Sequence, residues 1–267
     1  MRKNRTLLLT FVVISVLLSS CQKVIQLDLG TSVPQLVIQG NVYDQAGPYT
    51  VTLSKTVNFD APNIYPPVTN ATVTISDNAG NSEVLSQTVD GTYVTSALQG
   101  EIGRTYTMTV SVDGKTYTAS STMPEAVNID SIYFKKALFG GSTLVAVNIL
   151  NLPNKDNFYR VVNFVNDKQS TGFGVFSDNT SNAVIISYSF MPTTDTTVGN
   201  PQKLTKGDKI EVWLECLDKG VFEYFRTANR EGGQNASPAN PVSNISNGAL
   251  GYFNACSVRK DSITYQK

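Results

Sequence analysis

The chain contains no histidine among its 267 residues, and this absence removes several kinds of chemistry at once. Histidine is the commonest general base near neutral pH, a frequent zinc ligand, and the base of the usual serine and cysteine catalytic triads. Charged residues make up only 16% of the chain, and the 21 basic side chains balance the 21 acidic ones. A chain without excess positive charge offers no field that would favour nucleic acid. We therefore expect neither an enzyme nor a nucleic-acid partner.

Motifs that hold phosphate or metal are also missing. The segment Gly172-Phe173-Gly174 has neither a third glycine nor a following helix, so it does not form a phosphate-binding loop. The stretch from Asp77 to Asn81 superficially resembles a calcium loop, but it lacks the remaining ligands and the closing glutamate. A hairpin turn is the better interpretation, because Asp side chains accept hydrogen bonds from nearby backbone amides in turns. The sequence predicts no metal site and no cofactor.

Long apolar runs are absent apart from one near the start of the chain. Leu7 to Leu18 is apolar except for two residues, and basic residues precede it. The run is too short to cross a bilayer, which takes roughly 20 residues, and it fits a secretory signal peptide over residues 1–20. The sequence Leu18-Ser19-Ser20-Cys21 then has the form of a bacterial lipobox. We expect Cys21 to become the lipidated N-terminus, followed by a tether over residues 21–32; the alternative is an ordinary signal peptide with a chance cysteine.

Cysteine is rare, with three residues in the chain. Once Cys21 carries the anchor, only Cys216 and Cys256 remain. Export would place them in an oxidising compartment, where an even pair can close a disulfide. The spacing alone leaves two readings open, a disulfide or two buried free thiols.

What the sequence does contain is a series of short strands with apolar and polar residues in alternation. Tyr49–Ser54, Ala71–Ser76 and Tyr106–Val112 alternate with period two, and Asp113-Gly114 supplies the turn after the last of them. We predict an all-β fold of two β-sandwich-like domains, an immunoglobulin-like one over residues 33–125 and a β-rich one over residues 126–267. The second domain has one short helix near residues 221–230, ended by Gly232-Gly233.

Carboxylates offer the remaining route to catalysis. Glu211 and Glu215 share one face of the strand predicted over residues 209–217, with Trp213 between them. The opposite face is apolar, so we expect the acidic face to be solvated rather than to form a catalytic pair. A carboxylate-based glycosidase is kept as an alternative, and it requires two acids that converge in a cleft about 5–10 Å apart.

Aromatic residues in predicted loops are the candidate ligand or partner contacts. Phe59 and Tyr65 lie in a proline-rich loop, and Phe139 precedes Gly140-Gly141. Aromatic side chains dominate binding hot spots, and the alternative is that these residues only pack within their own loops.

A series of short motifs resembles one known family. In chain order they are Leu36-Val37-Ile38-Gln39-Gly40, Pro48–Ser54, Asn70-Ala71-Thr72-Val73, Asp90-Gly91-Thr92-Tyr93, Gly103-Arg104-Thr105-Tyr106, Pro238-Ala239-Asn240-Pro241, Asn244-Ile245 and Gly248-Ala249-Leu250-Gly251-Tyr252-Phe253. Together with the lipobox they resemble the Bacteroidota lipoprotein family catalogued as domain of unknown function 4249. The first half is also similar to immunoglobulin-like and carboxypeptidase-regulatory-like sandwiches.

The family resemblance implies a location and a partner but no catalytic residue. Members tend to be encoded beside TonB-dependent transporters, which implies a non-enzymatic binding or accessory lipoprotein of the outer membrane. The cell surface is the expected side of the membrane. Surface lipoproteins of this group often carry acidic residues just after the lipidated cysteine, and Gln22 to Gln26 contains none, so the periplasmic face stays open as the alternative. A structural or adhesive surface protein is the alternative function.

Overall fold

The computed structural model describes residues 33–58, 61–138, 141–152, 155–178, 184–192, 204–230 and 240–266. These residues form fifteen strands and one helix, which confirms the predicted all-β class. Nearly all of them belong to one compact unit, Pro34–Val57 together with Ala61–Lys267. No helix within the described ranges is both long and apolar enough to cross a membrane.

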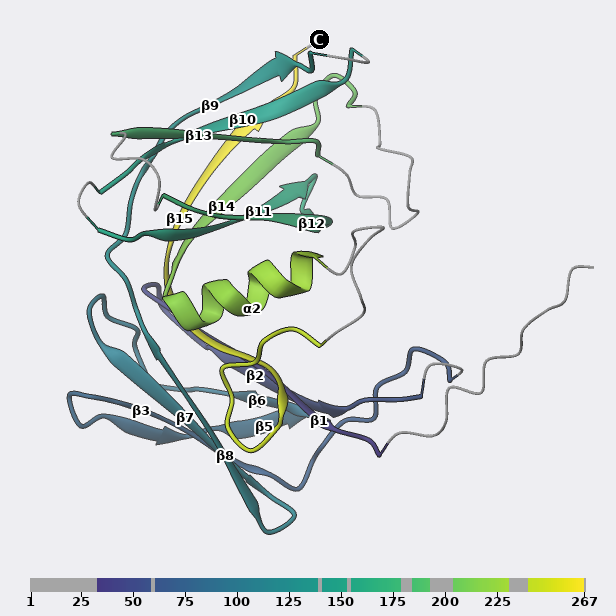
Figure 1. The fold of residues 1–267 in the computed structure, drawn as a ribbon, viewed down its shortest axis with the longest axis vertical. Helices are drawn as coiled ribbons and strands as arrows, with labels where there is room; N and C mark the ends of the chain where they lie inside the picture. Colours follow the sequence, from purple (N-terminus) through teal and green to yellow (C-terminus); the bar gives the residue numbers. More distant parts are fainter. Residues whose placement is uncertain are drawn as a thin grey trace, which may run out of the picture. The chain divides into compact units, whose positions relative to one another are not determined.

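The first eight strands form a sandwich of two sheets (Figure 1). The strands are β1 (Leu36–Tyr43), β2 (Thr50–Lys55), β3 (Thr72–Asp77), β4 (Ser82–Val84), β5 (Ser86–Val89), β6 (Thr92–Val94), β7 (Thr105–Val112) and β8 (Lys115–Thr122). One sheet has the order β1-β2-β6-β5 and the other β4-β3-β7-β8. With the strands lettered in chain order, this is the immunoglobulin arrangement, in which strands A, B, E and D face strands C′, C, F and G.

The alternating sequences explain how this sandwich is filled. On β7, Tyr106, Met108 and Val110 are fully buried while the threonines between them lie outside, as the period-two pattern predicts. The β7–β8 hairpin turns at Asp113 and Gly114, whose φ angles of 52° and 72° match the two-residue turn expected for Asp-Gly.

The remaining strands form a second pair of sheets. They are β9 (Ile129–Lys136), β10 (Thr143–Leu150), β11 (Phe158–Val165), β12 (Lys168–Ser177), β13 (Ile185–Phe190), β14 (Lys209–Leu217) and β15 (Leu250–Thr264). Strands β13-β10-β9 form one sheet, and β12-β11-β14-β15 form the other. Valine, isoleucine and leucine side chains from both sheets fill a second core between them.

Strand β15 belongs to both halves of the fold. Its first part pairs in parallel with β1, Leu250 opposite Val37, and its second part pairs antiparallel with β14. One eight-stranded sheet therefore runs through both halves. Whether residues 33–125 and 126–267 are separate folding domains stays a prediction.

Helix α2 (Lys219–Arg230) packs on the other face of the shared sheet. Phe253 and Ala255 of β15 point into the first core and Ile263 into the second, whereas the alternate residues Cys256 and Val258 contact the helix. The helix begins two residues before the predicted start. Asp218 caps it, because its carboxylate accepts a hydrogen bond of 2.9 Å from the Val221 amide.

Candidate functional site

A polar pocket of about 500 Å³ lies at one end of the first sandwich. The β3–β4 turn, strand β4 and the loop between β6 and β7 supply its walls. The lining residues are Asn81, Ser82, Glu83, Ser96, Ala97, Leu98, Gln99, Glu101 and Arg104, and we call this site the Glu83–Arg104 pocket. Its volume falls within the roughly 300–1,000 Å³ of small-ligand sites.

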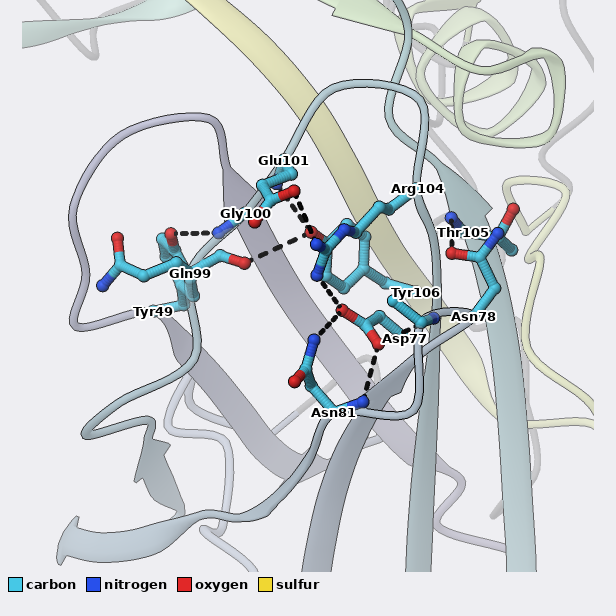
Figure 2. A network of polar contacts seen from close by, with 11 residues as sticks. Tyr49, Asp77, Asn78, Asn81, Gln99, Gly100, Glu101, Arg104, Thr105 and Tyr106 are labelled. Carbon is cyan, nitrogen blue, oxygen red and sulfur yellow. Dashed lines mark hydrogen bonds and ion pairs between the residues drawn. The ribbon is translucent and has the colours of Figure 1, made fainter.

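Arg104 lies between two carboxylates at this pocket (Figure 2). Its Nη1 donates to Asp77 Oδ2 at 2.6 Å, and its Nη2 lies 2.6 Å from Glu101 Oε2. The Asp77 side chain is fully buried, whereas that of Glu101 is 56% exposed. The hydrogen bond to Asp77 raises the pKa of Arg104, so its charge is permanent. The guanidinium therefore has its two terminal nitrogens already paired with anions.

Asp77 also organises the turn that carries Asn81. Its Oδ1 accepts from the amides of Ala79 and Asn81 at 3.0 and 2.8 Å, and its Oδ2 accepts from Asn81 Nδ2 at 2.8 Å. Burial alone would raise the pKa of Asp77, but the bonds from Asn81, Arg104 and Ala79 outweigh it and lower the pKa to about 2. The predicted hairpin turn over this stretch is confirmed, because strands β3 and β4 on either side of it pair antiparallel.

Glu83 holds the part of the pocket wall that the loop after β6 supplies. Its carboxylate accepts hydrogen bonds from the backbone amides of Ser96, Ala97 and Leu98, the last at 2.7 Å, and from the Ser96 hydroxyl at 2.8 Å. Burial acts to raise the pKa of Glu83, and the bonds from Ser96, Leu98 and Ala97 reverse this and lower it. The loop after β6 is thus held by a charged anchor from β4.

Two tyrosine hydroxyls form hydrogen bonds with the same loop. The Tyr106 hydroxyl accepts from the Glu101 amide at 2.6 Å and donates to the Gln99 carbonyl at 3.3 Å (Figure 2). The Tyr49 hydroxyl accepts from the Gly100 amide at 2.8 Å. A tyrosine at the start of strand F that bonds back to the preceding loop is a hallmark of immunoglobulin sandwiches. The pocket therefore lies at a corner of the fold where two tyrosine hydroxyls hold the loop by hydrogen bonds.

A second charged cluster lies beneath helix α2 and corrects one prediction. Glu215 was expected on a solvated strand face, but it is 2% exposed and pairs with Arg160 Nη1 at 2.9 Å. The Arg160 guanidinium also lies over the rings of Phe225 and Phe173, at 4.1 and 4.9 Å from their centres. Helix α2 covers this end of the strand, which the alternation pattern could not reveal. Burial raises the pKa of Glu215, and Arg160 offsets part of that rise.

The structure describes both cysteines of the candidate disulfide and one of the three aromatic candidates. Cys216 and Cys256 are both buried free thiols, so the candidate disulfide does not form. Cys216 lies opposite Ser257, the neighbour of Cys256, so the two thiols point to opposite faces of the sheet.

Tyr65 is 55% exposed and is not among the pocket residues. Phe59, Phe139 and Cys21 lie outside the described residues, so their predicted roles stay predictions.

The sequence did not single out Glu83, Ser96 or Gln99 as site residues. The only signal was indirect, because Arg104 lies in the Gly103-Arg104-Thr105-Tyr106 motif and Asp77 begins a recognised turn. A lone glutamate on a three-residue strand carries no pattern of its own. Among the described residues, no group of three or more Cys, Asp or Glu side chains is placed to hold a metal ion.

A comparison with known protein families gives a match. A family described as "Domain of unknown function (DUF4249)" matches residues 22–262. The chain belongs to this family. The match covers both sandwiches, and the family description assigns no activity. No curated protein matches the chain.

Two solved structures that are similar to this family member have low TM-scores. One is titled "Cytokine receptor complex - Crystal form 1A", with 8% identity, a TM-score of 0.27, and coverage of 86% of this chain and 95% of that one. Another is a two-domain fibronectin type-III segment from chicken tenascin, with 13% identity, a TM-score of 0.22, and coverage of 69% and 91%. At such scores these likenesses carry no argument, and the immunoglobulin-like arrangement rests on the strand order given above.

Proposed function

We propose that this family member is a non-enzymatic, lipid-anchored binding protein of the outer membrane that serves a TonB-dependent transporter. The observation that carries the binding role is the Glu83–Arg104 pocket, a preformed hollow whose hydrogen-bonding groups are held by the rigid end of an immunoglobulin-like sandwich. Sites of this kind bind small polar groups because the protein need not reorganise to receive them.

The protonation of the pocket acids favours binding over catalysis. A general acid or base works best when its pKa lies near the operating pH. The pKa values of Asp77 and Glu83 are both lowered from the usual carboxyl range, and both carboxylates accept several hydrogen bonds from the chain itself. Such groups remain charged and fixed at neutral pH, which suits recognition better than proton transfer.

The anchor and the partner rest on the sequence and on family membership. Lipidation at Cys21 would tie the mature chain to the membrane, since two or more acyl chains suffice for stable attachment. We propose a TonB-dependent transporter as the partner because members of the family are expected to be encoded beside such transporters. The cell surface is the proposed side of the membrane, and outer-membrane attachment itself does not depend on it.

Purification from native membranes tests the proposal. The intact lipoprotein, carrying a C-terminal affinity tag, should fractionate with the outer membrane and recover a TonB-dependent transporter after mild cross-linking. The Cys21→Ser variant should leave the membrane fraction and lose the transporter. Recovery of host glycans or adhesion targets in place of a transporter would support a structural or adhesive role. A Cys21→Ser protein that stays in the membrane would refute the anchor.

A further inference from the structure

We propose that the Glu83–Arg104 pocket receives a positively charged, hydrogen-bonding group, either a protonated amine or a guanidinium. The group can belong to a small amine or to a basic side chain of a protein partner, since both present the same chemistry. This inference rests on the proposed binding function, because it names the ligand class for the same pocket.

The charge at the pocket is negative. Among the lining residues, Glu83 and Glu101 carry two negative charges and Arg104 carries one positive charge, which leaves a formal charge of −1. The buried Asp77 carboxylate, which pairs with Arg104, brings the formal charge of the cluster to −2. Arg104 already pairs with Asp77 and Glu101. Glu83 keeps its negative charge, because it accepts its hydrogen bonds from neutral backbone amides and one hydroxyl. A concave surface with uncompensated negative charge attracts cations.

Anions find few free donors in this pocket. Both terminal nitrogens of Arg104 are bonded to carboxylates of the chain. The amides of Ser96, Ala97 and Leu98, which could otherwise hold a phosphate or carboxylate, donate to Glu83. An incoming anion would also meet the repulsion of the Glu83 and Glu101 carboxylates that line the pocket. The pocket therefore selects against phosphate and carboxylate ligands.

Acceptors for a cation are, by contrast, exposed. The Glu101 side chain is 56% exposed, so one carboxylate can be shared with a ligand. Asn81 uses its Nδ2 to bond Asp77, and its Oδ1 points away from that contact (Figure 2). The hydroxyl of Ser82 and the amide of Gln99 lie on the same lining. A volume of about 500 Å³ suits a polyatomic group with several N–H donors rather than a bare ion.

The test is a titration of the intact lipoprotein in detergent, followed by amide NMR and calorimetry. The cationic probes are spermidine and a short lysine-containing peptide, and the matched anionic probes are inorganic phosphate and citrate. We expect the cations, and not the anions, to shift the amide signals of Ser96 to Gln99. Tighter binding of the peptide than of spermidine would point to a partner side chain, and the reverse order to a small amine.

A pair of matched variants separates the pocket from general surface charge. Glu101→Gln removes an exposed, ion-paired carboxylate at the pocket, whereas Glu125→Gln removes a similarly exposed one, 57% exposed and paired with Lys155. Glu101→Gln should weaken cation binding at least about fivefold, and Glu125→Gln should leave it within about twofold. Equal effects of the two variants would overturn the inference.

The other outcomes distinguish this inference from the proposed function. Anions that shift the same amides more strongly than cations would refute the ligand class and leave the pocket as a binding site. No shift from any probe at millimolar concentration would refute this inference outright, while transporter recovery from native membranes would still test the accessory role independently.

Discussion

In the part of the chain that the structure describes, the two arginine–carboxylate pairs with the most deeply buried carboxylates behave in opposite ways. Arg104–Asp77 at the pocket has a carboxylate whose pKa is lowered to about 2, whereas Arg160–Glu215 beneath helix α2 has one whose pKa is raised. Both carboxylates are almost fully shielded from solvent, and both ion pairs are short. The difference lies in the other partners, because Asp77 also accepts from the Ala79 and Asn81 amides while Glu215 depends on Arg160.

This comparison shows that burial alone does not set the protonation of a carboxylate. Desolvation favours the neutral acid in both places, and one arginine only partly offsets it. Backbone amides that donate to the carboxylate decide the outcome at Asp77. They stabilise the charged form, and because they are neutral they lose no hydration of a charge when they are buried. The turn amides therefore help to keep Asp77 charged, whereas the charged form of Glu215 on strand β14 is stabilised by Arg160.

The largest expected effect is at the pair that lacks such support. Arg160→Met should lower the free energy of unfolding by about 3–5 kcal/mol, because Glu215 is left buried without its partner. Methionine keeps apolar contact with Phe173 and Phe225, so the loss reports mainly the charge. Urea denaturation measures it. The double variant Arg160→Met, Glu215→Leu should recover most of the loss, and a double variant as unstable as the single one would contradict this account.

At the supported pair the effect should be smaller. Asp77→Ala removes one ion pair and the acceptor for the turn amides, and we expect a loss of about 1–3 kcal/mol. Asp113→Asn is a suitable control, since this aspartate also lies in a hairpin turn but is 57% exposed. It should change stability by less than about 0.5 kcal/mol. Similar losses in the two variants, measured by the same denaturation, would mean that the Asp77 network is not special.

Acidic pH should sharpen the contrast between the pairs. The folded-state pKa of Asp77 is about 2, below its usual value of 3.8, so its contribution is present above pH 4 and is lost as the pH falls toward 2. Glu215 has the opposite sign, because its raised pKa favours proton uptake by the folded state and its ionisation opposes folding as the pH rises above 4.5. Midpoints of denaturation between pH 2 and pH 5 should fall more steeply for the wild type than for Asp77→Asn. Equal slopes would refute the assignment to Asp77.

The smallest expected effect is at Glu83. Glu83→Gln keeps one acceptor oxygen for the Ser96, Ala97 and Leu98 amides but removes the charge, and we expect a loss of about 1 kcal/mol. The change should be confined to the loop after β6. Hydrogen exchange of the Leu98 amide should quicken, while amides of β14 keep their protection. Unchanged exchange at Leu98 would show that the carboxylate does not hold this loop.

Much of the framework could be predicted from local patterns. The strands around Tyr106 and Lys209–Leu217, the Asp113-Gly114 turn and the helix near residues 221–230 all follow from alternation, turn residues or helical spacing, and the structure contains them. The pocket could not be predicted in the same way. Glu83 and Arg104 are far apart in the chain, and only the folding of β4 against the loop after β6 brings their surroundings together.

The sequence by itself determined the all-β class, the faces of the strands and the turns, because these depend on neighbours one to four residues away. Only the tertiary structure decided which polar face is covered. Glu211 and Glu215 follow the same alternation, yet helix α2 buries Glu215 and leaves Glu211 partly exposed. A period of two distinguishes the two faces of a strand, but what packs on each face depends on residues distant in the chain. For the same physical reason Cys216 and Cys256, on adjacent strands, contact different cores and do not meet.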